Sequence, residues 1–340
     1  EIIATLSGAT SESVQELCAK CICNLTCVPG LQDDIISHGI LQTILLIALV
    51  RTVKDKTKLV CARAVMNLMS DGTIEALKSA GAIRVFASIA AVPDININDQ
   101  CAQGFLIFTT TPQRREDICS RKACLQALFL MVKSPSAHCR VTVGRTVCNL
   151  LSCPRSQKHA IHAGALHVVK IVSTMDYPIL REAAARVIIN LLRQPSLHAI
   201  LLKSAPIVPI LSFIMQRAEG DDEVSDPEGG GRCIFEYAVA AMSCACQMKQ
   251  FRSSVIKDSG AASLVRACMD GKVLSVEIAT EVIRSFTLLT YEDDSAEALI
   301  DCHMLLALHI LYRKGLVTPD SAEMIALIIR NLSIVRRVHE

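Results

Sequence analysis

Ala62-Arg63-Ala64-Val65-Met66-Asn67-Leu68 is a motif that recurs along most of this 340-residue chain. The same order of small, apolar and amide residues stands at 19–25, 144–150 and 185–191, and a last copy ends in Asn331-Leu332. Weaker copies put Ile107, Ser243 and Ser285 at the Asn position. Successive copies lie 43, 40, 42, 41, 53, 42 and 46 residues apart, a period typical of stacked helical repeats.

A second motif follows each Asn by about 15 residues. Its copies lie at 35–41, 76–83, 160–166 and 255–261, with Gly at 39, 81, 164 and 260, whereas Lys122, Ala205 and His303 replace that Gly elsewhere. Gly readily adopts the left-handed conformation that turns a chain sharply between helices. Each unit is therefore predicted to be a short helix, a Gly bend, a second helix and a longer third helix that carries the Asn.

These two motifs resemble those of the armadillo repeat, and the resemblance covers nearly the whole chain. It implies an all-α fold, a right-handed superhelical solenoid in which each repeat buries its apolar faces only against its neighbours. We expect a single solenoid over 1–340, with a partial repeat at 1–27 and about seven full repeats over 28–340. The HEAT repeat is the nearest alternative, but it has two helices and lacks this Gly bend.

The composition agrees with a core of small aliphatic side chains. Of all residues 51% are hydrophobic but only 4% are aromatic, and Trp is absent. The net charge of +2 does not predict a nucleic-acid binder. The richest apolar run, residues 40–50, is shorter than the roughly 20 residues of a membrane span, so no direct span is predicted.

The 16 Cys lie mostly inside apolar helical patterns, which indicates reduced, buried thiols. This predicts a cytoplasmic protein, with cytoskeletal, ciliary or nuclear locations also open. Because the chain does not begin with Met and opens on an apolar helical pattern, we expect it to be part of a larger chain or complex.

The Asn of each third helix, and the residue four before it, share one face of that helix. In armadillo proteins this helix lines a concave groove. Cations or amides occupy these positions in the first five copies, which predicts a partner-binding site made by Lys20, Asn24, Arg63, Asn67, Gln103, Arg145, Asn149, Arg186 and Asn190. Such side chains suit an extended acidic segment. The alternative is a merely solvated polar stripe on an amphipathic helix.

The predicted function is that of a protein-binding scaffold or adaptor. One alternative is a structural component of a cytoskeletal or ciliary assembly that docks by its convex face or ends. A nuclear import receptor is less favoured, because importin-type members of the family carry Trp four before the Asn and this chain has none.

Catalytic and cofactor motifs are not recognised in the sequence, so an enzyme is not predicted and no cofactor is expected. Cys18, Cys21, Cys23 and Cys27 do not share one helix face, so a metal site is not predicted there. The 53-residue period contains an acidic, Gly-rich loop insertion at 216–232. This loop is interpreted as a tolerated surface insertion or, alternatively, as a regulatory segment in which Ser225, lying among the acids, is the phosphorylation site.

Overall fold

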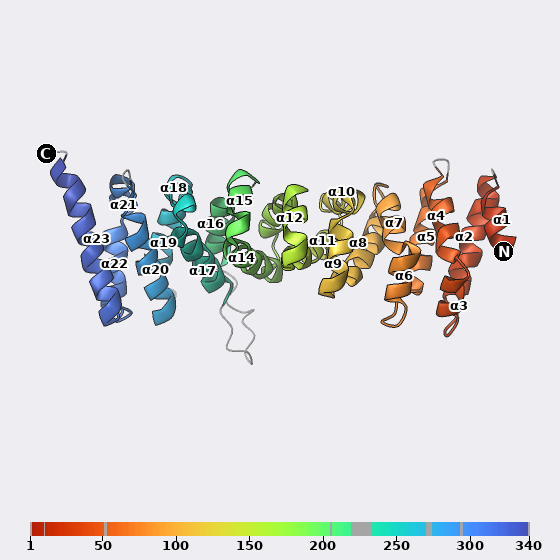
Figure 1. The fold of residues 1–340 in the computed structure, drawn as a ribbon, viewed down its shortest axis with the longest axis horizontal. Coiled ribbons are helices and arrows are strands. Elements are labelled where there is room, and N and C mark those ends of the chain that lie inside the picture. The colour runs from red at the N-terminus through yellow and green to blue at the C-terminus, as the bar shows by residue number, and fades with distance from the viewer. Residues whose placement is uncertain are drawn as a thin grey trace. The chain divides into compact units, whose positions relative to one another are not determined.

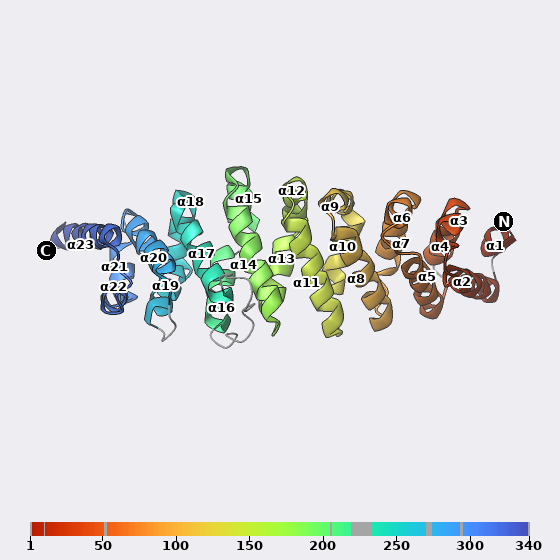
Figure 2. The same cartoon turned by 90° about the horizontal axis from the view of Figure 1, so that it is seen from below.

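The computed structural model describes residues 2–9, 11–50, 53–204, 206–218, 233–269, 274–292 and 295–338. Throughout this described part, the regular elements are helices and no strand occurs, which confirms the all-α prediction (Figures 1 and 2). The chain divides into two compact units, Glu1–Val169 (unit 1) and Lys170–Glu340 (unit 2). The boundary falls within one helix, α13, and each unit is described by itself.

The helices fall into three series that alternate along the chain. The first helices are short: α3 Gln32–Ser37, α6 Ile74–Ala80, α9 Pro112–Cys119, α12 Pro154–His162, α15 His198–Ser204 (after the 3-10 turn Pro195–Leu197), α18 Lys249–Lys257 and α21 Ala296–Asp301. The second helices are α1 Ile2–Ser7, α4 Ile40–Leu49, α7 Ala82–Ile89, α10 Lys122–Met131, α13 Ala165–Ser173, α16 Ile207–Arg217, α19 Gly260–Met269 and α22 Met304–Arg313. The third helices are α2 Glu12–Thr26, α5 Asp55–Asn67, α8 Ile95–Thr109, α11 Ala137–Leu151, α14 Pro178–Leu192, α17 Ile234–Gln247, α20 Val276–Leu289 and α23 Pro319–Val338.

Unit 1 is built by stacking helices of the same series. The third helices α2, α5, α8 and α11 pack successively, and so do the second helices α1, α4, α7 and α10. Small residues such as Ala62 on α5 and Ala102 on α8 are fully buried, and such side chains suit the close approach that stacked helices need. The few aromatic residues matter here, because Phe86, Phe105 and Phe108 are all completely buried.

Unit 2 repeats this plan. The third helices α14, α17, α20 and α23 pack in succession, and α16, α19 and α22 form the row of second helices. Its core is also aliphatic: Ala184, Ala241 and Val282 are fully buried, and Phe286 is the largest side chain among the completely buried ones of this unit. The core predicted from composition is therefore present in each unit.

The bends confirm most of the predicted glycines. Gly39, Gly81 and Gly164 have φ of 76°, 101° and 99°, so each turns the chain in the left-handed conformation. His303 adopts the same conformation, with φ of 66°, without the help of Gly.

The prediction that Gly260 forms a left-handed bend is wrong. Ser259, with φ of 63°, takes the left-handed position, and Gly260 is the first residue of α19. A Cβ on Gly260 would lie 2.8 Å from Val208 Cγ1 and 3.0 Å from Val255 Cγ1. Gly260 is therefore required by close helix packing and not by the backbone angle.

A side chain from the start of the next repeat caps the carboxyl end of most third helices. In each case a donor binds the backbone carbonyl five or six residues before it, at 2.5–2.8 Å. The donors are Thr73, Arg115, Gln157, His198, Arg252 and Ser295. These side chains satisfy carbonyls that the end of a helix leaves without an intrahelical partner.

None of the described helices alone is both long and apolar enough to cross a bilayer. Pro195–Lys203 and Ile207–Arg217 reach the required length and apolar composition only jointly, across an 87° bend.

Candidate functional site

The third-helix face of unit 1 carries the centre of the predicted site. Arg63 on α5, Gln103 on α8 and Arg145 on α11 hold equivalent positions on helices that pack directly against one another. Arg63 and Arg145 are exposed, and Gln103 is half-buried. The sequence folds this way because the neighbours of each cation, such as Ala62 and Ala64 around Arg63, are fully buried and fix the orientation of the helix.

The cations of this series differ in how they are paired. Lys20 Nζ lies 2.6 Å from Glu16 Oε1, and Arg186 Nη2 lies 2.6 Å from Glu182 Oε1. Both acids stand four residues before their cation, one helical turn away. The Lys20 ammonium, through its hydrogen bond, holds the pKa of Glu16 below its usual value. Lys20 and Arg186 are thus partly neutralised on their own helices.

Arg63 and Arg145 lack this neutralisation. The residue four before each is apolar, Leu59 in α5 and Val141 in α11. Across the described part of the chain, neither guanidinium forms an ion pair within 4 Å. The two arginines therefore offer the positive charge on this face that is least compensated.

Two of the predicted Asn side chains bind the neighbouring third helix. Asn67 Nδ2 donates to Thr26 Oγ1 at 3.2 Å, and Asn149 Nδ2 donates to Thr109 Oγ1 at 3.3 Å. Asn331 does the same in unit 2, to Thr290 Oγ1 at 3.0 Å. The recurring Asn thus stabilises the stack, a role that the sequence analysis did not predict.

The other predicted residues are placed as follows. Asn24 and Asn190 are exposed, and no side-chain hydrogen bond of theirs appears in the part of the chain that the structure describes. Arg186 also contacts Tyr237: its Cζ lies 4.5 Å from the ring centroid, and its Nη2 donates to the hydroxyl at 2.9 Å. Arg186 and Asn190 belong to unit 2, whereas Lys20 to Asn149 belong to unit 1. Ser225 and most of the acidic loop, 219–232, lie outside the described residues.

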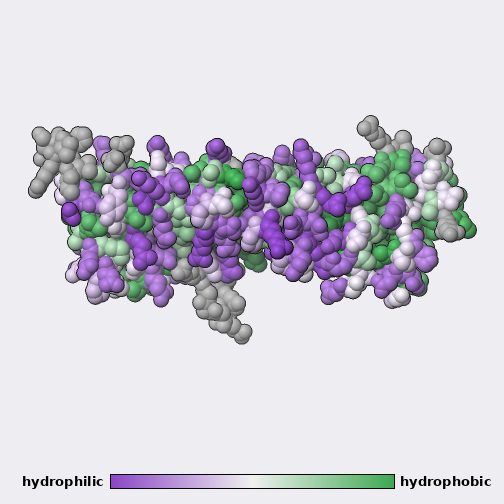
Figure 3. Space-filling view, viewed as in Figure 1, coloured by the Kyte–Doolittle hydropathy of each residue, from purple (hydrophilic) through white to green (hydrophobic). Residues whose placement is uncertain are grey.

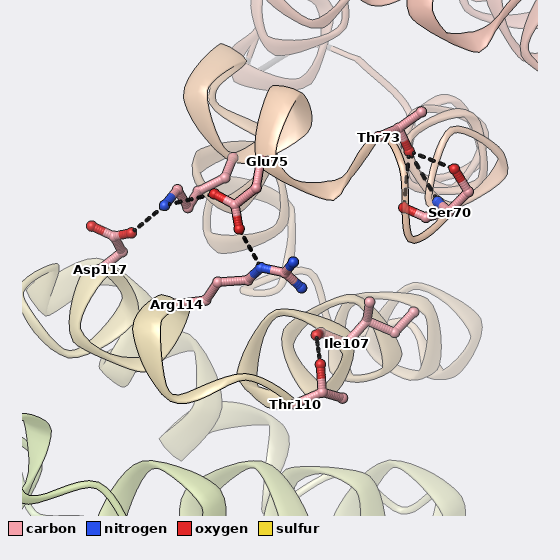
Figure 4. A network of polar contacts seen from close by, with 8 residues as sticks. Ser70, Thr73, Glu75, Ile107, Thr110, Arg114 and Asp117 are labelled. Carbon is pink, nitrogen blue, oxygen red and sulfur yellow. Dashed lines mark hydrogen bonds and ion pairs between the residues drawn. The ribbon is translucent and has the colours of Figure 1, made fainter.

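A polar network on the first helices of unit 1 is a separate feature (Figure 4). Lys78 Nζ on α6 lies 3.0 Å from Glu75 Oε2 and 3.1 Å from Asp117 Oδ2 on α9, and Arg114 Nε lies 2.5 Å from Glu75 Oε1. Here each charge has an opposite partner. The network links neighbouring repeats and presents little uncompensated charge to a ligand.

The thiols do not assemble a metal site in the described residues, where no group of three His, Cys, Asp or Glu side chains is placed to hold an ion. Burial raises the pKa of Cys61, Cys119 and Cys148 to about 12, so these thiols stay protonated. Cys18 is buried as expected, but Cys21 is exposed on another side of α2, and Cys27, which directly follows α2, is exposed too.

Comparisons with known proteins support the fold. No protein-family model matches the chain, and no curated protein matches it. Among solved structures, a computationally designed armadillo repeat protein for modular peptide recognition is similar, with a TM-score of 0.51 and 13% identity over 72% of this chain and 98% of that one. An engineered protein matches with a TM-score of 0.50 and 15% identity, over 75% of this chain and 97% of that one. The fold is thus of the armadillo-repeat type.

Proposed function

We propose that this chain is a protein-binding scaffold whose unit 1 holds an extended acidic segment along its third-helix face. The observation that carries the proposal is the pair of exposed, unneutralised guanidiniums of Arg63 and Arg145, with the amide of Gln103 between them. The similar structure described above, a computationally designed armadillo repeat protein for modular peptide recognition, supports the choice of a peptide as the ligand.

The geometry indicates the spacing of acids in the segment. Packed helices lie about 8–10 Å apart, so α5 and α11, separated by α8, lie roughly 16–20 Å apart. An extended chain advances about 3.3 Å per residue. Two Asp or Glu residues about five or six positions apart would therefore meet Arg63 and Arg145, each through a charge-assisted hydrogen bond. Gln103 can donate to and accept from the backbone between them.

The test is binding of a fluorescent extended peptide with two Asp residues at this spacing, at low and moderate salt. The Arg63→Glu/Arg145→Glu variant is expected to lose at least about tenfold in affinity, since each charged hydrogen bond contributes about 1.5–3 kcal/mol. The matched control, Arg84→Glu/Lys122→Glu, makes the same change of charge on second helices and is expected to bind as the parent does.

Equal binding by the parent and the Arg63/Arg145 variant would overturn the proposal. A peptide with the same composition but adjacent Asp residues separates a site of defined spacing from general attraction of negative charge. The alternative, a structural component that docks by its convex face or ends, predicts no dependence on Arg63 or Arg145.

A further inference from the structure

Within their described bounds, the second helices contain no carboxylate, and six of the eight contain one Lys or Arg each. None of the helices α1, α4, α7, α10, α13, α16, α19 and α22 includes Asp or Glu within its described bounds. Asp and Glu number 33 in the whole chain, almost as many as the 35 Lys and Arg, so an even distribution would place several acids in these helices. Burial alone does not explain the pattern, because it disfavours both signs of charge.

The cations of these helices point to solvent. Arg84 on α7, Lys122 on α10 and Lys170 on α13 are exposed, and in unit 2 Arg217, Arg266 and Arg313 are exposed too. Within the described part of the chain, these six side chains take part in no ion pair. The acids that pair with other cations, such as Glu16 and Glu75, lie on third and first helices.

Exposed leucines accompany the cations in unit 1. Leu46 and Leu49 on α4 are each 57% exposed, and Leu130 on α10 is 54% exposed. On the face shown in Figure 3, hydrophobic surface gathers towards the N-terminal end of unit 1, over α1 and α4. Because α4, α7 and α10 pack in succession, these leucines and Arg84 and Lys122 belong to one row of helices.

A small cavity lies between two of these helices. It measures about 230 Å³ and is lined by Arg84, Ala87 and Ser88 from α7 and by Arg121, Ala123 and Cys124 at the start of α10. Two guanidiniums thus border a space whose other walls are small side chains. An anionic headgroup of phosphate size fits this chemistry, because Arg binds phosphate oxygens in a bidentate manner.

We propose that the row of second helices in unit 1 (α4, α7 and α10) docks on the surface of an anionic lipid bilayer. The charge is complementary, since the row carries Arg84, Arg121 and Lys122 and no acid. The leucines favour a bilayer over a nucleic acid, because they can enter the boundary between headgroups and acyl chains while the cations stay at the headgroups. The cations of α7 and α10, which have no fixed partner, suit mobile headgroups that rearrange around the protein.

This docking surface is independent of the third-helix face, so each can exist without the other. The test is co-sedimentation of the full chain with vesicles of phosphatidylcholine alone and of phosphatidylcholine with phosphatidylserine, at low and moderate salt. The parent is expected to bind only the vesicles that contain phosphatidylserine, and less at moderate salt.

Two variants probe the surface. Arg84→Glu/Lys122→Glu is expected to lower the affinity at least about 25-fold, because each cation near an anionic membrane contributes about fivefold. Leu46→Ser/Leu130→Ser is expected to lose about tenfold for each leucine that enters the bilayer boundary. The Arg63→Glu/Arg145→Glu variant makes the same change of net charge on the third helices and is expected to bind vesicles as the parent does. Circular dichroism confirms that each variant is folded.

Three outcomes would overturn the proposal. The first is no binding of the parent to phosphatidylserine vesicles at low salt. The second is an equal loss in the Arg84/Lys122 and Arg63/Arg145 variants, which would show an effect of net charge alone. The third is that the Arg84/Lys122 variant loses binding to polyglutamate or to single-stranded DNA but keeps vesicle binding, in which case the surface serves an acidic protein or a nucleic acid.

Discussion

The recurring Asn of the third helix shows how far a single residue can be interpreted from sequence. Its spacing predicted the repeats, and its position on the helix predicted that it shares a face with Arg63 and Arg145. Its hydrogen bond to Thr26 or Thr109 was not predictable, because the Thr belongs to the preceding repeat, about 40 residues earlier. Only the packed structure shows which residue of that repeat lies opposite.

We predict that Asn149→Ala destabilises the chain. The substitution removes the donor to Thr109 Oγ1, and a lost intramolecular hydrogen bond costs about 1 kcal/mol. The measurement is the free energy of unfolding in urea. The control is Asn190→Ala, which removes an exposed Asn and is expected to change stability by less than about 0.5 kcal/mol. Equal losses in the two variants would contradict a stabilising role for the Asn149–Thr109 bond.

Arg63 and Arg145 also illustrate the limits of sequence pattern at the residue scale. The sequence pattern grouped Lys20 and Arg186 with these two arginines, because all four stand four residues before the position of the recurring Asn. The structure separates the pairs, since Glu16 and Glu182 bind their own cations at 2.6 Å. These acids stand four residues before each cation, so the sequence alone distinguishes the paired from the unpaired members.

At the scale of the element, the ends of the helices show which structural features a sequence can predict and which it cannot. The Gly bends were predictable because left-handed backbone strongly favours one residue type. The capping donors were not, because Thr73, Arg115, Gln157, His198, Arg252 and Ser295 perform the same task with different chemistry. A pattern that any hydrogen-bond donor can satisfy leaves no signature in one sequence.

We predict that Gln157→Ala weakens the junction of α11 with α12. Gln157 is buried, and its Nε2 donates to the Leu151 carbonyl at 2.8 Å, so removal leaves a buried acceptor without its partner. The expected loss is about 1–3 kcal/mol in the free energy of unfolding. Gln126→Ala on the exposed side of α10 is the matched control and is expected to be close to neutral. A neutral result for Gln157→Ala would show that water replaces this cap.

The absence of acids within the described bounds of the second helices is also an element-scale property. The positions of Asp and Glu are given by the sequence, but their distribution among the helices is apparent only when each helix has defined bounds. Helix α10, for example, ends at Met131 and begins at Lys122, directly after Arg121. Without these bounds, the neighbouring acids of the first helices, such as Asp117, obscure the pattern.

At the scale of the whole molecule, the period of the two recurring motifs predicted the armadillo type of fold. The division into Glu1–Val169 and Lys170–Glu340 was not predicted, because the repeat continues through the boundary at α13 without a change of composition. The candidate site therefore has most of its residues, from Lys20 to Asn149, in unit 1. The proposal of an extended acidic ligand accordingly rests on unit 1 alone.

Buried thiols make the stability of the molecule depend on pH. Burial raises the pKa of Cys61, Cys119 and Cys148 to about 12 and that of Cys124 and Cys139 to about 11, from an ordinary value of 9.0. A raised pKa means that the folded chain keeps a proton which the unfolded chain releases. The resulting stability is complete below pH 9 and is lost as the pH rises towards the folded values.

We therefore predict that stability falls above about pH 9, and that each buried thiol adds about 1.4 kcal/mol per pH unit to the slope. The measurement is the urea midpoint between about pH 7 and pH 10 under reducing conditions. Cys61→Ala/Cys148→Ala removes two of the raised groups and is expected to give a shallower fall than the parent. Cys21→Ala/Cys27→Ala removes two exposed thiols and is expected to leave the slope unchanged. Parallel curves for all three chains would mean that groups other than the buried thiols govern the alkaline limit of this fold.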